Sequence, residues 1–243
     1  MRPFTPPSLR LVALIALATL AACNVDSPTD PLSGGARASR RPRRTPNDPI
    51  LFVHGWNANS TTWNTMVSRF KKDGWASSEL ATWSYNPNQS NATTAEAIRT
   101  KVDSILLATG ATHVDIITHS MGSLSARYYT HFLGGDLKVD ALVTLGGPDH
   151  GTNTAFFCFS TACVEMRPNS TFIDNLNTTD ETWGAPRYGT WWSGCDEVIQ
   201  PQTSSILSGA MNTQTACMSH SQLHEDAGVY QEVRDWVKTP VLP

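Results

Sequence analysis

A serine that stands between a buried strand and a helix constrains the fold of this chain more than any other feature. The apolar run 113–118 leads into the pentapeptide THSMG at 118–122, and helix-forming residues follow. Such a turn holds its serine in a strained conformation, so small residues must flank it where strand and helix crowd each other. Gly122 meets this need on the helix side, whereas Thr118 replaces the first glycine of the usual G-x-S-x-G pattern. We interpret Ser120 as an activated nucleophile.

A serine nucleophile needs a histidine base and a carboxylate, which follow it in the order acid, then base, in folds with this turn. Of the seven histidines, two lie near the C-terminus, before the final amphipathic helix. We predict His220 as the base, with His224 as the alternative. The acid should come directly after the strand expected at 187–193. Asp196 is the predicted acid, with Glu197 as the neighbour that must be weighed against it.

The oxyanion hole of such a site is built from two backbone N–H groups. One belongs to the residue after the nucleophile, which is Met121. The other follows the first core strand, and the stretch 49–56 runs as an apolar strand into His-Gly-Trp. We predict the N–H of Trp56 as the second donor. His54 is interpreted as structural, packing the loop.

Strand and helix patterns alternate from residue 48 onward. Strands are expected at 50–54, 79–85, 113–118, 141–146, 187–193 and 213–217, and helices at 60–73, 92–109, 121–133, 169–177 and 227–238. This alternation predicts a parallel sheet that is covered by helices on both faces. We expect a minimal α/β-hydrolase fold with a mostly parallel, six-stranded sheet.

Five stretches of the chain resemble the class 2 lipases, a family of small bacterial α/β hydrolases. These are 49–56, 114–122, ALVTLGGPDHGT at 141–152, CDEVI at 195–199, and 219–223 with Val229. The resemblance covers most of residues 48–238. It implies hydrolysis of acylglycerols or similar lipid esters, with no cofactor and no metal in the chemistry. It also places the nucleophile, acid and base on Ser120, Asp196 and His220.

Two other functions remain open. A polyester depolymerase of the polyhydroxyalkanoate-degrading type shares this kind of serine turn and needs an exposed apolar cleft. A catalytically silent, hydrolase-like surface lipoprotein that only binds is the second. The presence of all three triad residue types in the required order speaks against a silent protein, because sequence drift usually loses one of them.

The segment 156–186 is longer than a plain connection between two strands. Its large apolar side chains either line an acyl pocket or belong to a disulfide-tied loop and a helix that packs on the sheet. These side chains are Phe156, Phe157, Phe159, Met166, Phe172 and Trp183.

The N-terminus is typical of a targeting segment. Arg2 and Arg10 precede the apolar run 11–20, which is too short to span a membrane. The sequence LAAC at 20–23 resembles a lipobox, in which Cys23 becomes the lipidated new N-terminus and anchors the chain to a membrane. An ordinary secretory signal that is cut after an alanine is the alternative.

Three regions therefore follow one another along the chain. Residues 1–23 are the expected signal peptide, 24–47 a disordered linker rich in Pro, Ser, Gly and Arg, and 48–243 the catalytic domain. The product is expected to be exported, as an envelope lipoprotein or in secreted form. From Asp48 onward there are 19 acidic and 11 basic residues, a net charge of −8, which argues against nucleic-acid binding. We expect a monomer whose partner is a lipid or small ester substrate.

Four cysteines remain after Cys23, an even number that indicates two disulfides in an exported protein. Three connectivities are possible, and the spacing matches no zinc pattern. We expect Cys195 to pair with Cys217, because the acid and base loops must lie side by side. Cys158 and Cys163 would then form the second pair.

Overall fold

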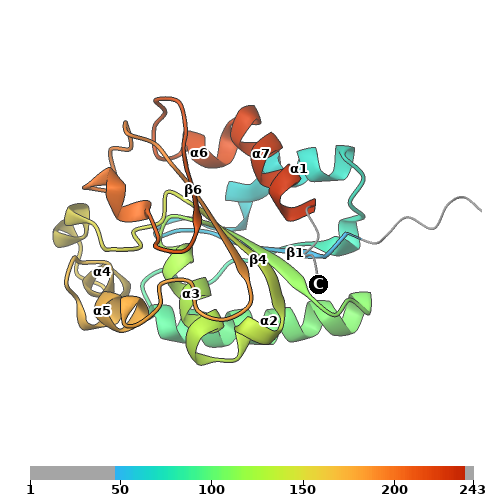
Figure 1. The fold of residues 1–243 in the computed structure, drawn as a ribbon, viewed down its shortest axis with the longest axis horizontal. Coiled ribbons are helices and arrows are strands. Elements are labelled where there is room, and N and C mark those ends of the chain that lie inside the picture. The colour runs from blue at the N-terminus through green and yellow to red at the C-terminus, as the bar shows by residue number, and fades with distance from the viewer. Residues whose placement is uncertain (1–46, 239–243) are drawn as a thin grey trace, which may run out of the picture. The chain divides into compact units, whose positions relative to one another are not determined.

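The structure is a computed structural model that describes residues 47–238 (Figure 1). The expected signal peptide, with its lipobox at Cys23, lies outside the described residues, as do residues 24–46 of the linker. None of the described helices combines the length and the apolar character needed to cross a membrane.

One sheet of six strands, all of them parallel to their neighbours, forms the centre of the described domain. The strands lie in the order β2-β1-β3-β4-β5-β6. Their bounds are β1 Ile50–Val53, β2 Leu80–Thr82, β3 Val114–His119, β4 Val139–Leu145, β5 Arg187–Trp192 and β6 Met211–Gln214. This confirms the expected α/β fold and its six-stranded sheet.

Helices connect the strands and cover both faces of the sheet, with α1 and α7 on one side and α2 and α3 on the other (Figure 1). The helices are α1 Asn64–Lys72, α2 Asn91–Thr109, α3 Gly122–Phe132, α4 Thr161–Glu165, α5 Thr171–Asn177, α6 Gln222–Glu225 and α7 Ala227–Lys238. Adjacent parallel strands require such crossovers, because the chain must return to the end of the sheet where the previous strand began.

The central strands are apolar at every position because both of their faces are buried. In β1, Ile50 and Phe52 pack with the helices α1 and α7, whereas Leu51 and Val53 pack with α2 and α3. All four side chains are fully buried. Side chains of a strand alternate between its two faces, so this short strand contributes to two separate cores.

The edge strand β2 is shorter than the expected 79–85. Beyond its end the chain turns towards the loop after β1. The Ser84 side-chain oxygen accepts a hydrogen bond from the Ser60 N–H at 3.0 Å, and the Tyr85 ring stacks on His54 at 4.0 Å. The Tyr85 hydroxyl also donates to the His54 carbonyl. These contacts agree with a packing role for His54.

The other edge strand, β6, begins two residues and ends three residues earlier than the expected 213–217. The chain leaves the sheet before Cys217, which forms a disulfide instead of a strand position. The helix expected at 60–73 begins as a 3-10 turn, Ser60–Trp63, and continues as α1. The short helices α4 and α6 were not expected from the sequence, because they are too short to show apolar periodicity.

Candidate active site

Ser120 lies on a tight turn between β3, which ends at His119, and α3, which begins at Gly122. Its φ is +55°, in the left-handed region that residues with a side chain seldom adopt. The Ser120 N–H donates to the carbonyl of Leu145 at 2.9 Å, and its own carbonyl accepts from the Ser123 N–H at 3.0 Å. Strain of this kind persists only where the surroundings hold it in place, which is typical of functional turns.

Small residues surround this turn for steric reasons. A Cβ atom on Gly122 would stand 2.6 Å from the carbonyl oxygen of Val53, and one on Gly55 would stand 2.7 Å from the Cβ of Ser120. Thr118 fits in place of the usual first glycine because its hydroxyl donates to the Val143 carbonyl of the neighbouring strand at 2.9 Å.

His220 and Asp196 form a buried pair. Nδ1 of His220 lies 2.7 Å from Oδ2 of Asp196, the geometry of a hydrogen bond from the ring N–H to the carboxylate. The other carboxylate oxygen accepts the backbone N–H groups of Val198 at 2.8 Å and Ile199 at 2.9 Å. The Asp196 carboxylate is therefore held in one orientation, and Nε2 is the ring nitrogen of His220 that is not paired with the acid.

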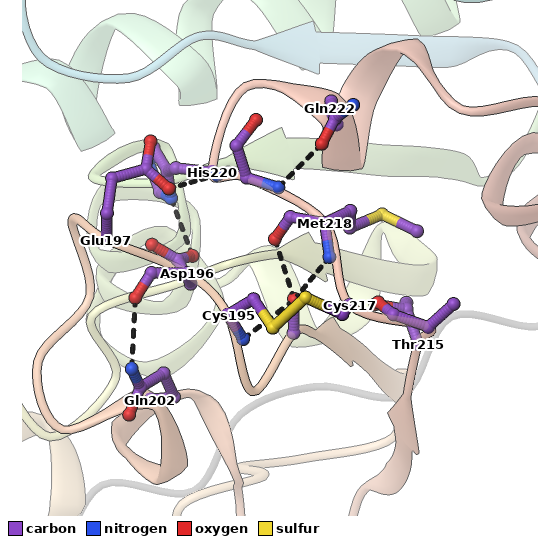
Figure 2. The surroundings of a disulfide bond; sticks show 12 residues. Cys195, Asp196, Glu197, Gln202, Thr215, Cys217, Met218, His220 and Gln222 are labelled. Atoms are coloured by element: carbon purple, nitrogen blue, oxygen red, sulfur yellow. Dashed lines mark hydrogen bonds and ion pairs between the residues drawn. A yellow bond between two sulfur atoms is a disulfide. The ribbon is translucent and has the colours of Figure 1, made fainter.

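The two alternatives are placed differently. Glu197 is exposed, and its Oε2 accepts the backbone N–H of His220 at 3.1 Å without reaching the imidazole (Figure 2). His224 lies in α6, and Nδ1 of its ring is 3.4 Å from the carboxylate of Glu225, whose side chain is 46 % exposed. The geometry of an oriented, buried acid–base pair is found at Asp196 and His220.

A disulfide ties the loop of Asp196 to the loop of His220. Cys195 and Cys217 are joined with their Cα atoms 5.1 Å apart, next to Asp196 and three residues before His220 (Figure 2). The Ser193 hydroxyl donates to the Met218 carbonyl at 2.7 Å and accepts the Met218 N–H at 3.0 Å. The second disulfide joins Cys158 to Cys163. Both pairs are those expected from the sequence.

Replacement of Cys195 and Cys217 by alanine is expected to lower both thermal stability and turnover. The bond closes a loop with a sequence separation of 22, for which the chain-entropy model gives at most about 3 kcal/mol of the free energy of unfolding. We expect turnover to fall before the sheet melts, because Asp196 and His220 lose their tie. Parallel scans of esterase activity and of circular dichroism against temperature measure this. A count of four free thiols in the oxidised, exported protein would contradict the pairing.

Ser120 and His220 open on one cavity of about 500 Å³, which Gly55 and Trp56 also line. Hydrogen bonds within residues 47–238 include none from Ser120 Oγ to the imidazole, and none from the N–H groups of Trp56 or Met121. Such contacts often tighten only once substrate is bound. Neither N–H is engaged by another group of the described residues, so both stay candidates for the oxyanion hole.

His119 contacts His220, which its local sequence does not predict. Its Nε2 donates to the backbone carbonyl of His220 at 3.1 Å, and the two ring centres are 4.5 Å apart. Burial holds the pKa of His119 well below its ordinary value, so this ring is neutral at physiological pH. Its only sequence signal is its place beside Ser120, which says nothing about where its side chain lies.

The described residues offer one group of carboxylates with metal-ligand spacing, and it lies away from the cavity. Asp48, Asp115 and Asp140 approach within 4.8 Å of one another beside the starts of the central strands. Arg187 already pairs with Asp140 at 2.6 Å. Burial raises the pKa of Asp115 well above its usual range, which favours a protonated carboxyl over a cation ligand.

Comparison with known proteins places the chain in a family. The profile of the family described as Lipase (class 2) matches residues 47–239, most of the chain. The chain belongs to the class 2 lipase family. The resemblance noted from the sequence is thereby confirmed, and family membership makes this class 2 lipase a hydrolase of the lipase and esterase type.

Solved structures agree on the fold of this class 2 lipase. The mature form of the Bacillus licheniformis lipase BlEst2 superposes with a TM-score of 0.72 at 16 % identity, over 80 % of this chain and 94 % of that one. Aspergillus fumigatus lipase B gives a TM-score of 0.67 at 15 % identity, over 79 % of this chain and 53 % of that one. Legionella pneumophila phospholipase PlaB gives 0.59 at 14 %, over 72 % and 53 % respectively. At such identities the likeness concerns the fold alone.

Proposed function

We propose that this chain hydrolyses acylglycerols or related lipid esters through an acyl-enzyme formed on Ser120. The observation that carries the proposal is the buried Asp196–His220 hydrogen bond of 2.7 Å, which borders the same cavity as a serine on a strained turn. A serine on a strained turn and a histidine that is hydrogen-bonded to a buried aspartate are the residues that a serine hydrolase uses to form an acyl-enzyme.

The first half of the reaction forms the acyl-enzyme. Nε2 of His220 takes the proton from Ser120 Oγ as the oxygen attacks the ester carbonyl carbon. Asp196 keeps the Nδ1–H tautomer in place and stabilises the imidazolium without taking its proton. The carbonyl oxygen becomes an oxyanion that accepts the N–H groups of Trp56 and Met121. When the intermediate collapses, the C–O bond breaks and the leaving alkoxide takes the proton from His220.

The second half repeats these steps with water. His220 takes a proton from a water molecule, the hydroxide attacks the acyl carbonyl, and the new tetrahedral intermediate releases the fatty acid. The proton then returns from the imidazolium to Ser120 Oγ. No cofactor enters either half, because proton transfer and backbone hydrogen bonds supply the whole chemistry.

The cavity favours a substrate with an apolar acyl group. Its walls beside Ser120 carry the side chains of Ala155, Phe157, Met166 and Ile199. The volume of about 500 Å³ lies in the usual range for small-molecule sites, in which apolar walls hold the ligand and a few polar groups fix its orientation.

Hydrolysis of p-nitrophenyl esters of graded acyl length, beside a triacylglycerol emulsion, tests the proposal. We expect release of p-nitrophenol, together with labelling of a single peptide by a fluorophosphonate at Ser120. Absence of turnover on every ester, with no labelled serine, would falsify an acyl-enzyme mechanism and favour a protein that only binds.

We also propose that the protein is exported, since two disulfides are typical of oxidising compartments. The lipobox-like sequence at 20–23 predicts a lipidated Cys23 at the N-terminus of the mature chain. A diacylglyceryl group plus an amide-linked acyl chain would provide stable anchoring, whereas a single acyl chain binds membranes only marginally. Mass spectrometry of the native protein measures this. A soluble product that is cut at another bond and carries no acyl group would contradict it.

A further inference from the structure

Three phenylalanine rings stand in solvent on the loop that follows β4. Phe156, Phe157 and Phe159 are 52 %, 87 % and 82 % exposed, respectively. A single exposed apolar side chain needs no explanation, but neighbouring ones mark a surface that meets an apolar partner. Residues 153–163, which carry these rings, are called the phenylalanine loop below.

The phenylalanine loop is held in one conformation. The Cys158–Cys163 disulfide closes its second half. Arg167 donates from Nε to the Ala155 carbonyl at 3.3 Å and from Nη2 to the Cys158 carbonyl at 3.0 Å. The covalent cross-link and these two hydrogen bonds hold the backbone that carries the three rings.

The rings face outward because the inner side of the loop is already packed. Ala155 and Cys163 are buried in one cluster with Met121 and Leu124, at the start of the helix behind the nucleophile. On the outer side, the Arg167 guanidinium lies over the rings of Phe156 at 5.3 Å and Phe159 at 5.9 Å. These two rings therefore share one support and lie on one exposed surface of the phenylalanine loop.

This surface adjoins the candidate active site. Phe157 and Cys158 line the same cavity as Ser120, and so does Trp56, which is 39 % exposed. A partner that binds the phenylalanine loop therefore also contacts the opening of the cavity that contains Ser120.

Charge indicates what kind of surface this is. Residues 153–163 contain no Asp, Glu, Lys or Arg, and the Arg167 guanidinium is a positive charge that lies against two of the rings. The chain from Asp48 onward has a net charge of −8. Such a net charge repels anionic surfaces and leaves an uncharged one as the fitting partner.

We propose that the phenylalanine loop docks this chain on the surface of an uncharged lipid aggregate, a triacylglycerol droplet, and holds the cavity entrance against it. The inference rests on the proposed esterase function, since it identifies the physical state of the substrate. Because the loop is cross-linked, docking uses the rings in their present positions rather than the opening of a lid.

The test compares two pairs of exposed apolar residues. Phe156→Ser/Phe159→Ser removes two docking rings and leaves the cavity walls intact. Leu107→Ser/Leu137→Ser is the matched control, because these side chains are 88 % and 76 % exposed. They precede β3 and β4 along the chain, at the end of the sheet where these strands begin. Each variant is assayed on p-nitrophenyl butyrate below its solubility limit and on emulsified triolein.

We expect Phe156→Ser/Phe159→Ser to lose at least about tenfold on the emulsion, since burial of one such ring is worth roughly that factor. On the dissolved ester it should stay within about twofold of the parent, and the control should stay within about twofold on both substrates. Equal losses on both substrates would overturn docking by placing the rings in the acyl site or the fold. No loss on either would show that the patch is not used.

Adsorption is measured separately in the Ser120→Ala background, which binds without hydrolysis. Triolein droplets, phosphatidylglycerol vesicles and polyhydroxybutyrate granules are offered to the chain with and without Phe156→Ser/Phe159→Ser. Ring-dependent adsorption to triolein alone supports the proposal. Adsorption to the anionic vesicles or the granules in preference to triolein would overturn it. Since no turnover is needed, this arm decides docking even if the esterase proposal fails.

Discussion

Ser120→Ala is expected to reduce ester hydrolysis to below about a hundredth of the parent rate, because loss of a triad nucleophile usually costs several orders of magnitude. The hydroxyl of Ser120 makes no hydrogen bond to another group within residues 47–238, so its removal should leave the fold intact. Turnover of p-nitrophenyl butyrate, together with the thermal unfolding midpoint, measures both parts.

Ser221 provides the control for this variant. It borders the same cavity but does not lie on the strained turn, so Ser221→Ala should retain most of the activity. If Ser120→Ala kept more than about a hundredth of the parent turnover, Ser120 would not be the nucleophile. If only Ser221→Ala were inactive, the serine after the base would have to be reconsidered.

The second large effect concerns the base. His220→Ala should be nearly inactive, losing roughly 10⁴-fold or more in turnover. Among the histidines of residues 47–238, His220 alone has an imidazole oriented by a buried carboxylate. His224→Ala should retain most of the activity, since the nearest carboxylate to its ring is that of Glu225 at 3.4 Å. Steady-state turnover of a soluble ester distinguishes the two.

A matched pair on the acid side checks the same geometry. In Asp196→Asn the amide oxygen would stay with the Val198 and Ile199 N–H groups, and the NH2 would face Nδ1 of His220. This favours the wrong imidazole tautomer, so the variant should resemble the base variant. Glu197→Gln retains an oxygen that can accept the His220 backbone N–H. Inactivity of His224→Ala beside an active His220→Ala would move the base by four residues. It would also undo the assignment of the C-terminal loop.

The parts that followed from the sequence are those set by periodicity and chain order. The interior strands follow from apolar runs, which report burial directly, and Ser120 follows from the strand and helix that flank it. Asp196 and His220 follow from the chain order of nucleophile, acid and base, each in a loop after a strand. Their 2.7 Å contact agrees with that reasoning.

What did not follow depends on contacts between loops. The bond from His119 to the His220 carbonyl joins segments 101 residues apart, and no local pattern encodes it. The phenylalanine loop had two interpretations, an acyl pocket or a tied connection, and the structure divides its rings between them. Phe157 lines the cavity, whereas Phe156 and Phe159 stand outside it. Composition alone cannot tell a ring that packs inward from one that packs outward.

The position of β6 at the rim of the sheet has a consequence for how activity is lost. Ser120, the proposed nucleophile, follows β3, which has a neighbour on each side. His220, the proposed base, follows β6, which among the described strands pairs with β5 alone and is largely exposed. Rim strands open at lower free energy than the interior of a domain. The proposed catalytic residues therefore lie partly beside an interior strand and partly beside an edge strand that opens more easily. We therefore expect mild heat to inactivate the protein by a local opening that displaces His220 while the rest of the domain stays folded. Stabilising this rim should then prolong activity more than repacking the interior does.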